Sequence, residues 1–177
     1  IARARQILRS KAPSSALIDL PELEFLQGLE AVRGGLVTHT GMVLFARRDV
    51  LARHCPQAQF HYVLHDSETS VARNDIDRLP LLEAVERMEQ IFQGPLNPEK
   101  EIELGLFKLR IPQFPLEGVR EAVLNALTHR DYQHPGEILV RHSSQELVVT
   151  SPGGFVDGIT PENILRHEAV PRNRTLA

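Results

Sequence analysis

Residues 118–132 read GVREAVLNALTHRDY, and apolar side chains recur in this stretch at helical spacing. One stripe along the helix would be formed by Val119, Val123, Leu124 and Leu127. Glu121, Asn125 and His129 are spaced four residues apart and lie on a different face. The pattern therefore predicts a helix over residues 115–130 that packs against the protein on one side and is polar on the other.

The polar face carries a carboxylate and a carboxamide one helical turn apart, and both would point toward the same small volume. This arrangement suits a carboxylate that activates water beside an amide oxygen that binds a hard cation. The spacing by itself favours the alternative, a solvent-exposed face on which Glu121 and Asn125 have no chemical role.

Three short motifs follow one another in the second half of the chain. They are REAVLNALTHRDY at residues 120–132, PGG at 152–154 and PRN at 171–173. This series resembles the family of RecG-like helicase C-terminal regions and related transcriptional regulators. That family is a divergent branch of the ATPases typified by gyrase, Hsp90 and histidine kinases.

The resemblance implies an ATP-binding module that uses ATP and Mg²⁺. In the larger superfamily a glutamate of the first motif activates the attacking water, which implies Glu121 as the catalytic residue. An asparagine one turn later holds magnesium, which implies Asn125 as a ligand of both metal and nucleotide. The remaining motifs imply further nucleotide-binding residues, namely Gly153, Gly154, Arg172 and Asn173.

The implied fold is α+β, a helix-and-strand connector followed by a truncated two-layer α/β sandwich of the gyrase, Hsp90 and histidine kinase type. The connector would cover residues 1–95, and residues 37–45 (VTHTGMVLF) match a segment that joins an upstream domain to the ATPase part. The sandwich would cover residues 96–177, with helix 115–130 lying over a small sheet.

Two other functions remain open. The glycines at 153 and 154 lack the neighbouring aspartate with which the superfamily reads adenine, which favours a noncatalytic scaffold for protein interaction or dimerisation. The basic residues of segment 2–11 could contact DNA, although a solvated helix face is the favoured interpretation. We otherwise expect DNA contact through regions outside this chain, and a homodimer in which two copies shield apolar faces from water.

The composition describes a globular protein of 177 residues, 42% of them hydrophobic, which is enough for a substantial core. No apolar run approaches the roughly 18 to 20 residues that a membrane span requires, so we expect no membrane partner. Cys55 is the only cysteine, which excludes an internal disulfide and a cysteine zinc site and fits a cytoplasmic location. The net charge of −3 provides no global basic field. Because the first residue is Ile1, we expect a fragment of a longer protein.

Two enzyme classes are not supported by the motifs. No glycine is followed by Lys and Ser or Thr as in a P-loop, so helicase motor chemistry is not expected. The HRD triplet at 129–131 is also found in kinase catalytic loops, but Gly136 stands where such a loop needs asparagine. We instead expect Arg130 and Asp131 to pair and cap the helix end, with Tyr132 packed beneath.

Apolar periodicity and capping residues predict four further helical regions and one more helical start. The first covers residues 2–11. The second begins at Pro21 and ends at the glycine pair 34–35, and the third is capped by Thr38 and runs through 41–45. A longer helix covers 82–92, stops at 94–95 and carries an outward ion pair between Glu83 and Arg87. A short helix opens at residues 160–162.

Alternating patterns predict the strands. Residues 59–65 form a half-buried strand on which His61 and His65 lie about 13 Å apart, too far for one metal ion, so surface histidines are expected. Residues 67–77 read as a mobile loop. Residues 101–111 form a strand whose apolar phase slips near Leu106 and Phe107, which indicates a bulge or bend. Residues 137–142 and 146–150 form a hairpin.

Overall fold

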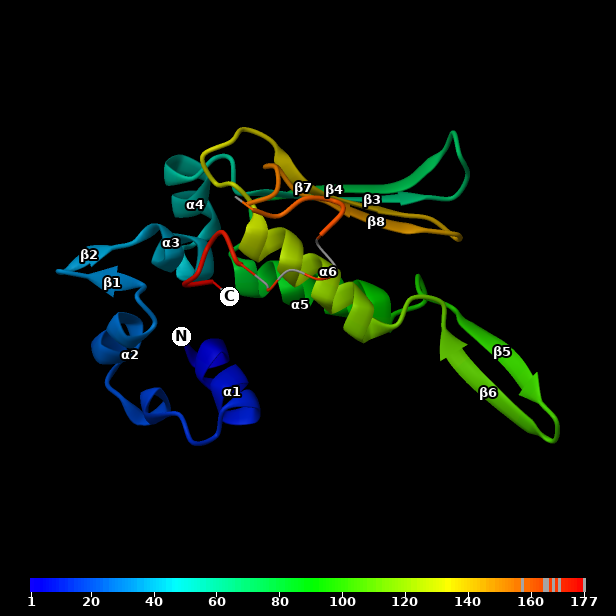
Figure 1. Cartoon of the computed structure of the whole chain (residues 1–177), viewed down its shortest axis with the longest axis horizontal. Helices are drawn as coiled ribbons and strands as arrows, with labels where there is room; N and C mark the ends of the chain where they lie inside the picture. The colour runs from blue at the N-terminus through cyan, green and yellow to red at the C-terminus, as the bar shows by residue number, and fades with distance from the viewer. Residues whose placement is uncertain (157, 164–165, 167, 169, 177) are drawn as a thin grey trace.

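The computed structural model of the chain describes residues 1–156, 158–163, 166, 168 and 170–176. Its centre is a four-stranded sheet that two long helices cover on one face, as Figure 1 shows. The α+β class expected from the sequence is therefore confirmed. Within the described residues, no helix combines the length and the apolar character needed to cross a membrane.

The sheet has the strand order β4-β3-β7-β8. Strand β3 (Gln59–His65) runs antiparallel to β4 (Val71–Asp77) and parallel to β7 (Glu137–His142). Strand β8 (Leu147–Thr150) is antiparallel to β7, which confirms the predicted hairpin.

The expected loop over 67–77 is wrong for most of its length, because residues 71–77 form the edge strand β4. The side chains of β4 are mostly exposed, so burial imposes no apolar alternation on its sequence. It is a strand because its backbone pairs with that of β3, and the sequence pattern gives no sign of this pairing.

Helices α5 (Leu81–Gln93) and α6 (Leu116–His129) confirm the two longest helical predictions. Both begin after a proline, and α5 ends at Gly94 as expected. The predicted ion pair between Glu83 and Arg87 is wrong. The carboxylate of Glu83 lies 2.9 Å from the guanidinium of Arg48, and the guanidinium of Arg87 lies 3.3 Å from the carboxylate of Asp75. Each side chain thus pairs with a residue of a neighbouring element instead of with the other.

One hydrophobic core joins the sheet to these helices. It includes Phe60 and Phe92 from the first 95 residues and Val123 and Val140 from the rest, each less than 5% exposed. Strands on both sides of residue 95 exchange backbone hydrogen bonds in the pairing of β3 with β7. The division expected at residue 95 thus runs through a shared sheet and a shared core.

The N-terminal region contains several short elements. They are α1 (Ala2–Lys11), η1 (Ala16–Asp19), α2 (Glu22–Gly28), β1 (Val32–Arg33), β2 (Leu36–Val37), α3 (His39–Phe45) and α4 (Arg48–His54). The expected helix end at 34–35 is wrong, because Gly34 and Gly35 adopt φ values of 58° and 78° and form the turn between β1 and β2. The predicted cap of α3 is confirmed, since Thr38 accepts a 3.0 Å hydrogen bond from the backbone of Gly41.

The arginines of α1 make contacts within the protein. Arg3 pairs with Glu86 of α5. Arg5 donates to the carbonyls of Ile18 and Leu20, and its guanidinium lies 4.9 Å from the ring centre of Phe25. Of the four basic side chains of this helix, Arg3 therefore contacts α5 and Arg5 contacts the rest of the N-terminal region.

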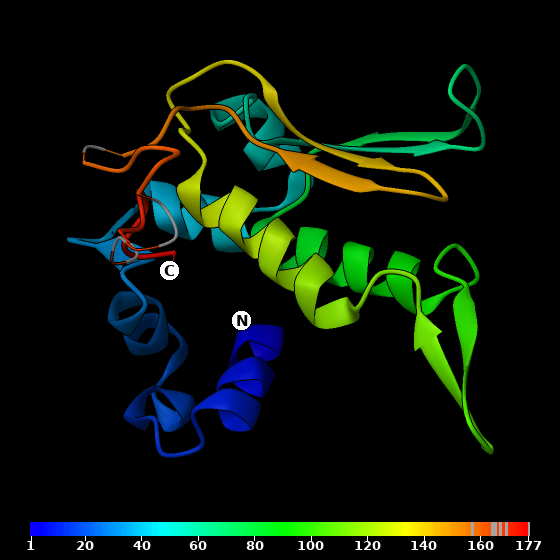
Figure 2. The ribbon, with the colours of Figure 1, turned by 45° about the vertical axis from the view of Figure 1, so that its right-hand side comes forward.

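Strands β5 (Glu99–Leu104) and β6 (Phe107–Pro112) form a separate hairpin that projects from the body, as Figures 1 and 2 show. The predicted single strand with a bulge is wrong. Gly105, with φ of 62°, starts a two-residue turn that reverses the chain. The slip in apolar phase at residues 106 and 107 marks this reversal.

Candidate functional site

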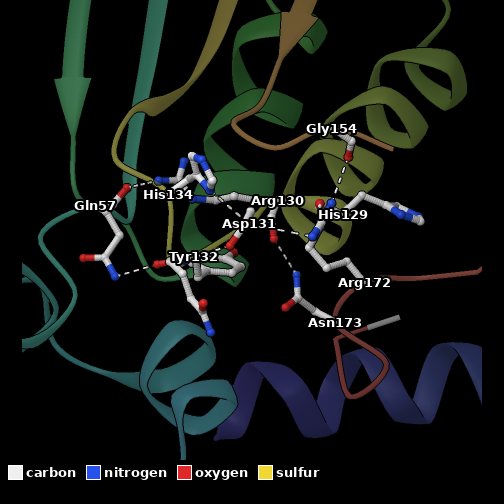
Figure 3. A network of polar contacts seen from close by, with 10 residues as sticks. Gln57, His129, Arg130, Asp131, Tyr132, His134, Gly154, Arg172 and Asn173 are labelled. Carbon is white, nitrogen blue, oxygen red and sulfur yellow. Dashed lines mark hydrogen bonds and ion pairs between the residues drawn. The ribbon is translucent and has the colours of Figure 1, made fainter. Parts of the chain in front are cut away.

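The three sequence motifs meet at the C-terminal end of α6, where Figure 3 shows a connected polar network. The side-chain amide of Asn173 donates to the carbonyls of Thr128 and Arg130 at 2.7 and 2.8 Å. Arg172 donates through Nε to the carbonyl of His129 at 3.2 Å. These bonds satisfy carbonyl groups that a helix end leaves without intrahelical donors.

The glycine loop at residues 152–154 is tied to the same network. The backbone N–H of Asp131 donates to the carbonyl of Pro152 at 2.9 Å, and Arg172 donates through Nη2 to the carbonyl of Gly154 at 2.8 Å. Gly153 adopts φ of +109°, and a Cβ at this position would lie 3.0 Å from Cβ of Asp131. The loop therefore requires glycine at 153 for both its conformation and its close approach.

Arg130 is completely buried beneath the end of α6. It donates through Nη2 to the carbonyls of Gln57 and Gly136, and its guanidinium lies 5.3 Å from the ring centre of Tyr132. Its Nε and Nη1 have no partner among the described residues. Burial lowers the pKa of this guanidinium from its ordinary value.

The expected pairing of Arg130 with Asp131 is wrong, since the two adjacent side chains serve different parts of the structure. Asp131 accepts from the backbone of Gln133, and its carboxylate lies 3.2 Å from His134 and 3.7 Å from Arg172. The Gln133 N–H is the main reason that the pKa of Asp131 is lowered, with His134 and Arg172 contributing.

The packing expected for Tyr132 is confirmed. Its hydroxyl donates to the carbonyl of Leu127 at 3.1 Å, and its own carbonyl accepts from the side-chain amide of Gln57 at 2.7 Å. Burial raises the pKa of the Tyr132 phenol, so this group stays neutral and acts as a donor.

A cavity of about 620 Å³ lies between α6, β8 and the glycine loop. Its described lining is mostly apolar, with the polar side chains of Asn125, His129, Ser151 and Glu168 and the glycine backbone added. The other lining residues are Ala122, Ala126, Leu147, Val149, Gly153, Gly154, Phe155, Val156, Ile159 and Val170. Asn125, which is far from Gly153 and Gly154 in sequence, thus lines the same cavity as the two glycines.

Glu121 lies beside this cavity, on an exposed part of α6. The side-chain amide of Asn125 donates to Oε1 of Glu121 at 3.2 Å, as the one-turn spacing predicts. The described residues that line the cavity do not include Glu121, Arg172 or Asn173. Of the expected site residues, Asn125, Gly153 and Gly154 therefore line the cavity, and Glu121 lies beside it. Arg172 and Asn173 instead bond to the glycine loop and to the end of α6.

The donor set fits a magnesium ion that a nucleotide shares. The contact between Asn125 and Glu121 leaves the amide oxygen and the second carboxylate oxygen available. Magnesium commonly takes one or two protein oxygens and completes its shell with water and phosphate oxygens. Among the described residues, no cluster of three His, Cys, Asp or Glu side chains would hold a metal alone.

Some members of the site were not expected from the sequence. Gln57 and Gly136 accept hydrogen bonds from Arg130 through their carbonyls, which any residue type supplies, so no sequence signal marks them. Ala122 and Ala126 are different. Two small residues one turn apart beside Asn125 leave room along that face of the helix, and this pattern could have indicated the cavity.

A second hollow, of about 650 Å³, lies between the turns that follow β3 and β7. It is lined by polar residues 65–68 and 141–146, and none of the expected site residues is among them. Elsewhere on the sheet, His61 contacts Glu137 at 2.7 Å and Asn74 at 2.5 Å.

The chain is similar to one family model over part of its length and to solved structures over nearly all of it. Residues 1–61 match a family described as a domain of unknown function (DUF8451). No curated protein matches the sequence. The solved structures that resemble it include the DIP2311 protein from Corynebacterium diphtheriae, with 28% sequence identity and a TM-score of 0.76. That likeness covers 99% of this chain and 35% of the other, so the chain spans about a third of that protein.

Proposed function

We propose that the cavity beside α6 binds an adenine nucleotide together with Mg²⁺. The chain would then carry a divergent ATP-binding module of the gyrase, Hsp90 and histidine kinase type, within a transcriptional regulator or helicase-related protein. The observation that carries this proposal is that Asn125, Gly153 and Gly154 line the same cavity.

The shape and lining of the cavity support a ligand of this kind. Its volume of about 620 Å³ is in the range of small-molecule sites. The aliphatic side chains of Leu147 and Val149, with the two alanines of α6, offer an apolar surface to a base. Gly154 has no other group within 4 Å of the place where a Cβ would stand, so phosphate oxygens can approach its backbone.

Binding and hydrolysis depend on different residues in this proposal. Asn125 and the glycine loop bind the nucleotide, and bound Mg²⁺ would neutralise phosphate charge. Glu121, one turn from Asn125, would accept a proton from the attacking water. Its carboxylate must leave the 3.2 Å contact with Asn125 and turn toward the cavity.

Isothermal titration calorimetry with ATP and magnesium chloride tests the binding step. We expect binding by the unmodified chain and at least about a tenfold loss of affinity in Asn125→Ala, since a metal ligand is removed. Glu117→Gln, an exposed change on the first turn of α6, is the matched control and should bind normally. Absence of measurable binding by the unmodified chain would reject the proposal.

Glu121→Gln separates binding from chemistry. This variant should keep its nucleotide affinity but release no phosphate in a continuous phosphate assay. If the unmodified chain binds ATP without releasing phosphate, the site is a nucleotide sensor and Glu121 has no catalytic role.

The second candidate is a noncatalytic interaction or dimerisation scaffold. It is favoured because Arg172 and Asn173 bond to the end of α6, and because Glu121 is held by Asn125. In a scaffold Glu121→Ala would leave partner binding unchanged, and calorimetry with ATP would give no signal. The two candidates thus predict opposite results in the same titration.

A further inference from the structure

The hairpin β5–β6, which we call the arm, has one apolar face and one charged face. In its register Ile102 lies opposite Leu109 and Leu104 opposite Phe107, so alternate residues share a face. The apolar face and tip consist of Ile102, Leu104, Leu106, Phe107, Leu109 and Ile111. These side chains are 41% to 100% exposed.

The other face of the arm carries ion pairs between its two strands. Lys108 lies 2.7 Å from Glu101 and 3.4 Å from Glu103, and Arg110 lies 3.8 Å from Glu101. The arm contains equal numbers of acidic and basic residues, with Glu99 and Lys100 completing the set. Because the arm has no net charge, it does not favour a nucleic acid or another strongly charged partner.

The root of the arm is fixed to the body by Asn97, which is 7% exposed. Its side-chain amide donates to the carbonyls of Phe92 and Phe114 at 3.0 and 2.8 Å, and its oxygen accepts from the backbone of Phe114 at 2.8 Å. Both strands of the arm are thereby tied to the end of α5. The root of the arm is therefore bonded to the body, while the arm itself projects away from the body, as Figure 2 shows.

A two-stranded hairpin is marginally stable by itself in water, and monomeric proteins rarely expose continuous apolar patches of more than a few hundred Å². With roughly 200 Å² for each large apolar side chain when fully exposed, the exposed fractions give roughly 700 Å² per arm. Two such faces together would bury roughly 1,400 Å², which is within the standard size of a specific protein interface.

We propose that the apolar face of the arm is a homodimer interface, in which the arms of two copies pack face to face about a two-fold axis. Such an interface is self-complementary, since the same patch serves both copies. Ile102 and Leu109 lie at the middle of the face and would be next to the axis. Phe107 is the aromatic anchor, and Lys100 at the root can extend its ammonium to the rim.

Sedimentation velocity over a wide range of protein concentration tests this interface. The sedimenting mass of the unmodified chain should rise from that of a monomer to that of a dimer as the protein concentration increases. Phe107→Glu should remain monomeric throughout, with an unchanged circular dichroism spectrum, because the Phe107 side chain is 75% exposed. Lys108→Gln changes the neighbouring residue on the opposite face and should dimerise normally.

Cysteine cross-linking tests the two-fold geometry. Leu109→Cys should form a disulfide-linked dimer on mild oxidation, and Lys108→Cys should not. Cys55 is buried and does not compete.

A chain that stays monomeric at every concentration, or a dimer that persists in Phe107→Glu, would overturn the proposal. The arm would then face another partner or another part of a longer chain. Neither result depends on whether the cavity binds ATP.

Discussion

Gly153 and Gly154 are adjacent, but only Gly153 has a positive φ and a close neighbour that favour glycine. We predict that Gly153→Ala lowers the free energy of unfolding by about 1 to 2 kcal/mol or more, because alanine resists a positive φ. The added Cβ would also meet Asp131 at 3.0 Å. Gly154→Ala places its Cβ in open space and should change stability by less than about 0.5 kcal/mol. Urea denaturation of both variants measures the difference, and equal effects would contradict it.

His142 is 2% exposed, with Nδ1 2.7 Å from the hydroxyl of Tyr62 and its ring against Phe92. Burial lowers its pKa below the ordinary 6.5, and burial raises the pKa of Tyr62 to about 12. As pH falls below about 6.5, the unfolded chain takes up a proton that the folded His142 resists. We therefore predict that this residue makes the protein less stable toward acid and has no effect above that pH.

The measurement is the free energy of unfolding as a function of pH, in the unmodified chain and in a Tyr62→Phe, His142→Leu double variant. The double variant removes both polar groups, so no buried hydroxyl loses its partner. Its stability should fall less steeply below pH 6.5. His61 acts in the opposite direction, since burial lowers its pKa but the bonds to Glu137 and Asn74 outweigh that effect and raise it. An unchanged slope would show that His142 is not the responsible group.

The helices and strands that bury one face and expose the other were predicted correctly from the sequence. Strand β3 and helices α5 and α6 have a buried face, so their apolar periods are clear. Strand β4 was not recognised, because its side chains are mostly exposed and its sequence carries no apolar alternation. The arm was predicted as one strand, because its apolar alternation continues on both sides of the turn that starts at Gly105. The cavity wall was partly predictable, since Asn125 and the glycines stood in short motifs, whereas its apolar floor comes from β8 and depends on the sheet order.

The end of α6 provides a test of what the PRN motif does. Asn173→Ala removes the amide that donates to the carbonyls of Thr128 and Arg130. We predict a loss of about 1 to 3 kcal/mol in the free energy of unfolding, measured by chemical denaturation. Arg174→Ala, an exposed neighbour, is the control and should be nearly neutral. A variant of Asn173 that keeps full stability but loses ATP affinity would instead assign this residue to the nucleotide site.

The molecule as a whole should unfold as one unit, because β3 and β7 pair across residue 95 and share a core. The chain has two tyrosines and no tryptophan, with Tyr62 on one side of that position and Tyr132 on the other. In Tyr132→Phe the fluorescence reports Tyr62, and in Tyr62→Phe it reports Tyr132. We predict that in each variant the fluorescence and far-ultraviolet circular dichroism transitions coincide during urea unfolding. If the two probes instead separate within either variant, residues 1–95 and 96–177 unfold independently. The division drawn from the sequence would then describe the protein better than its shared sheet does.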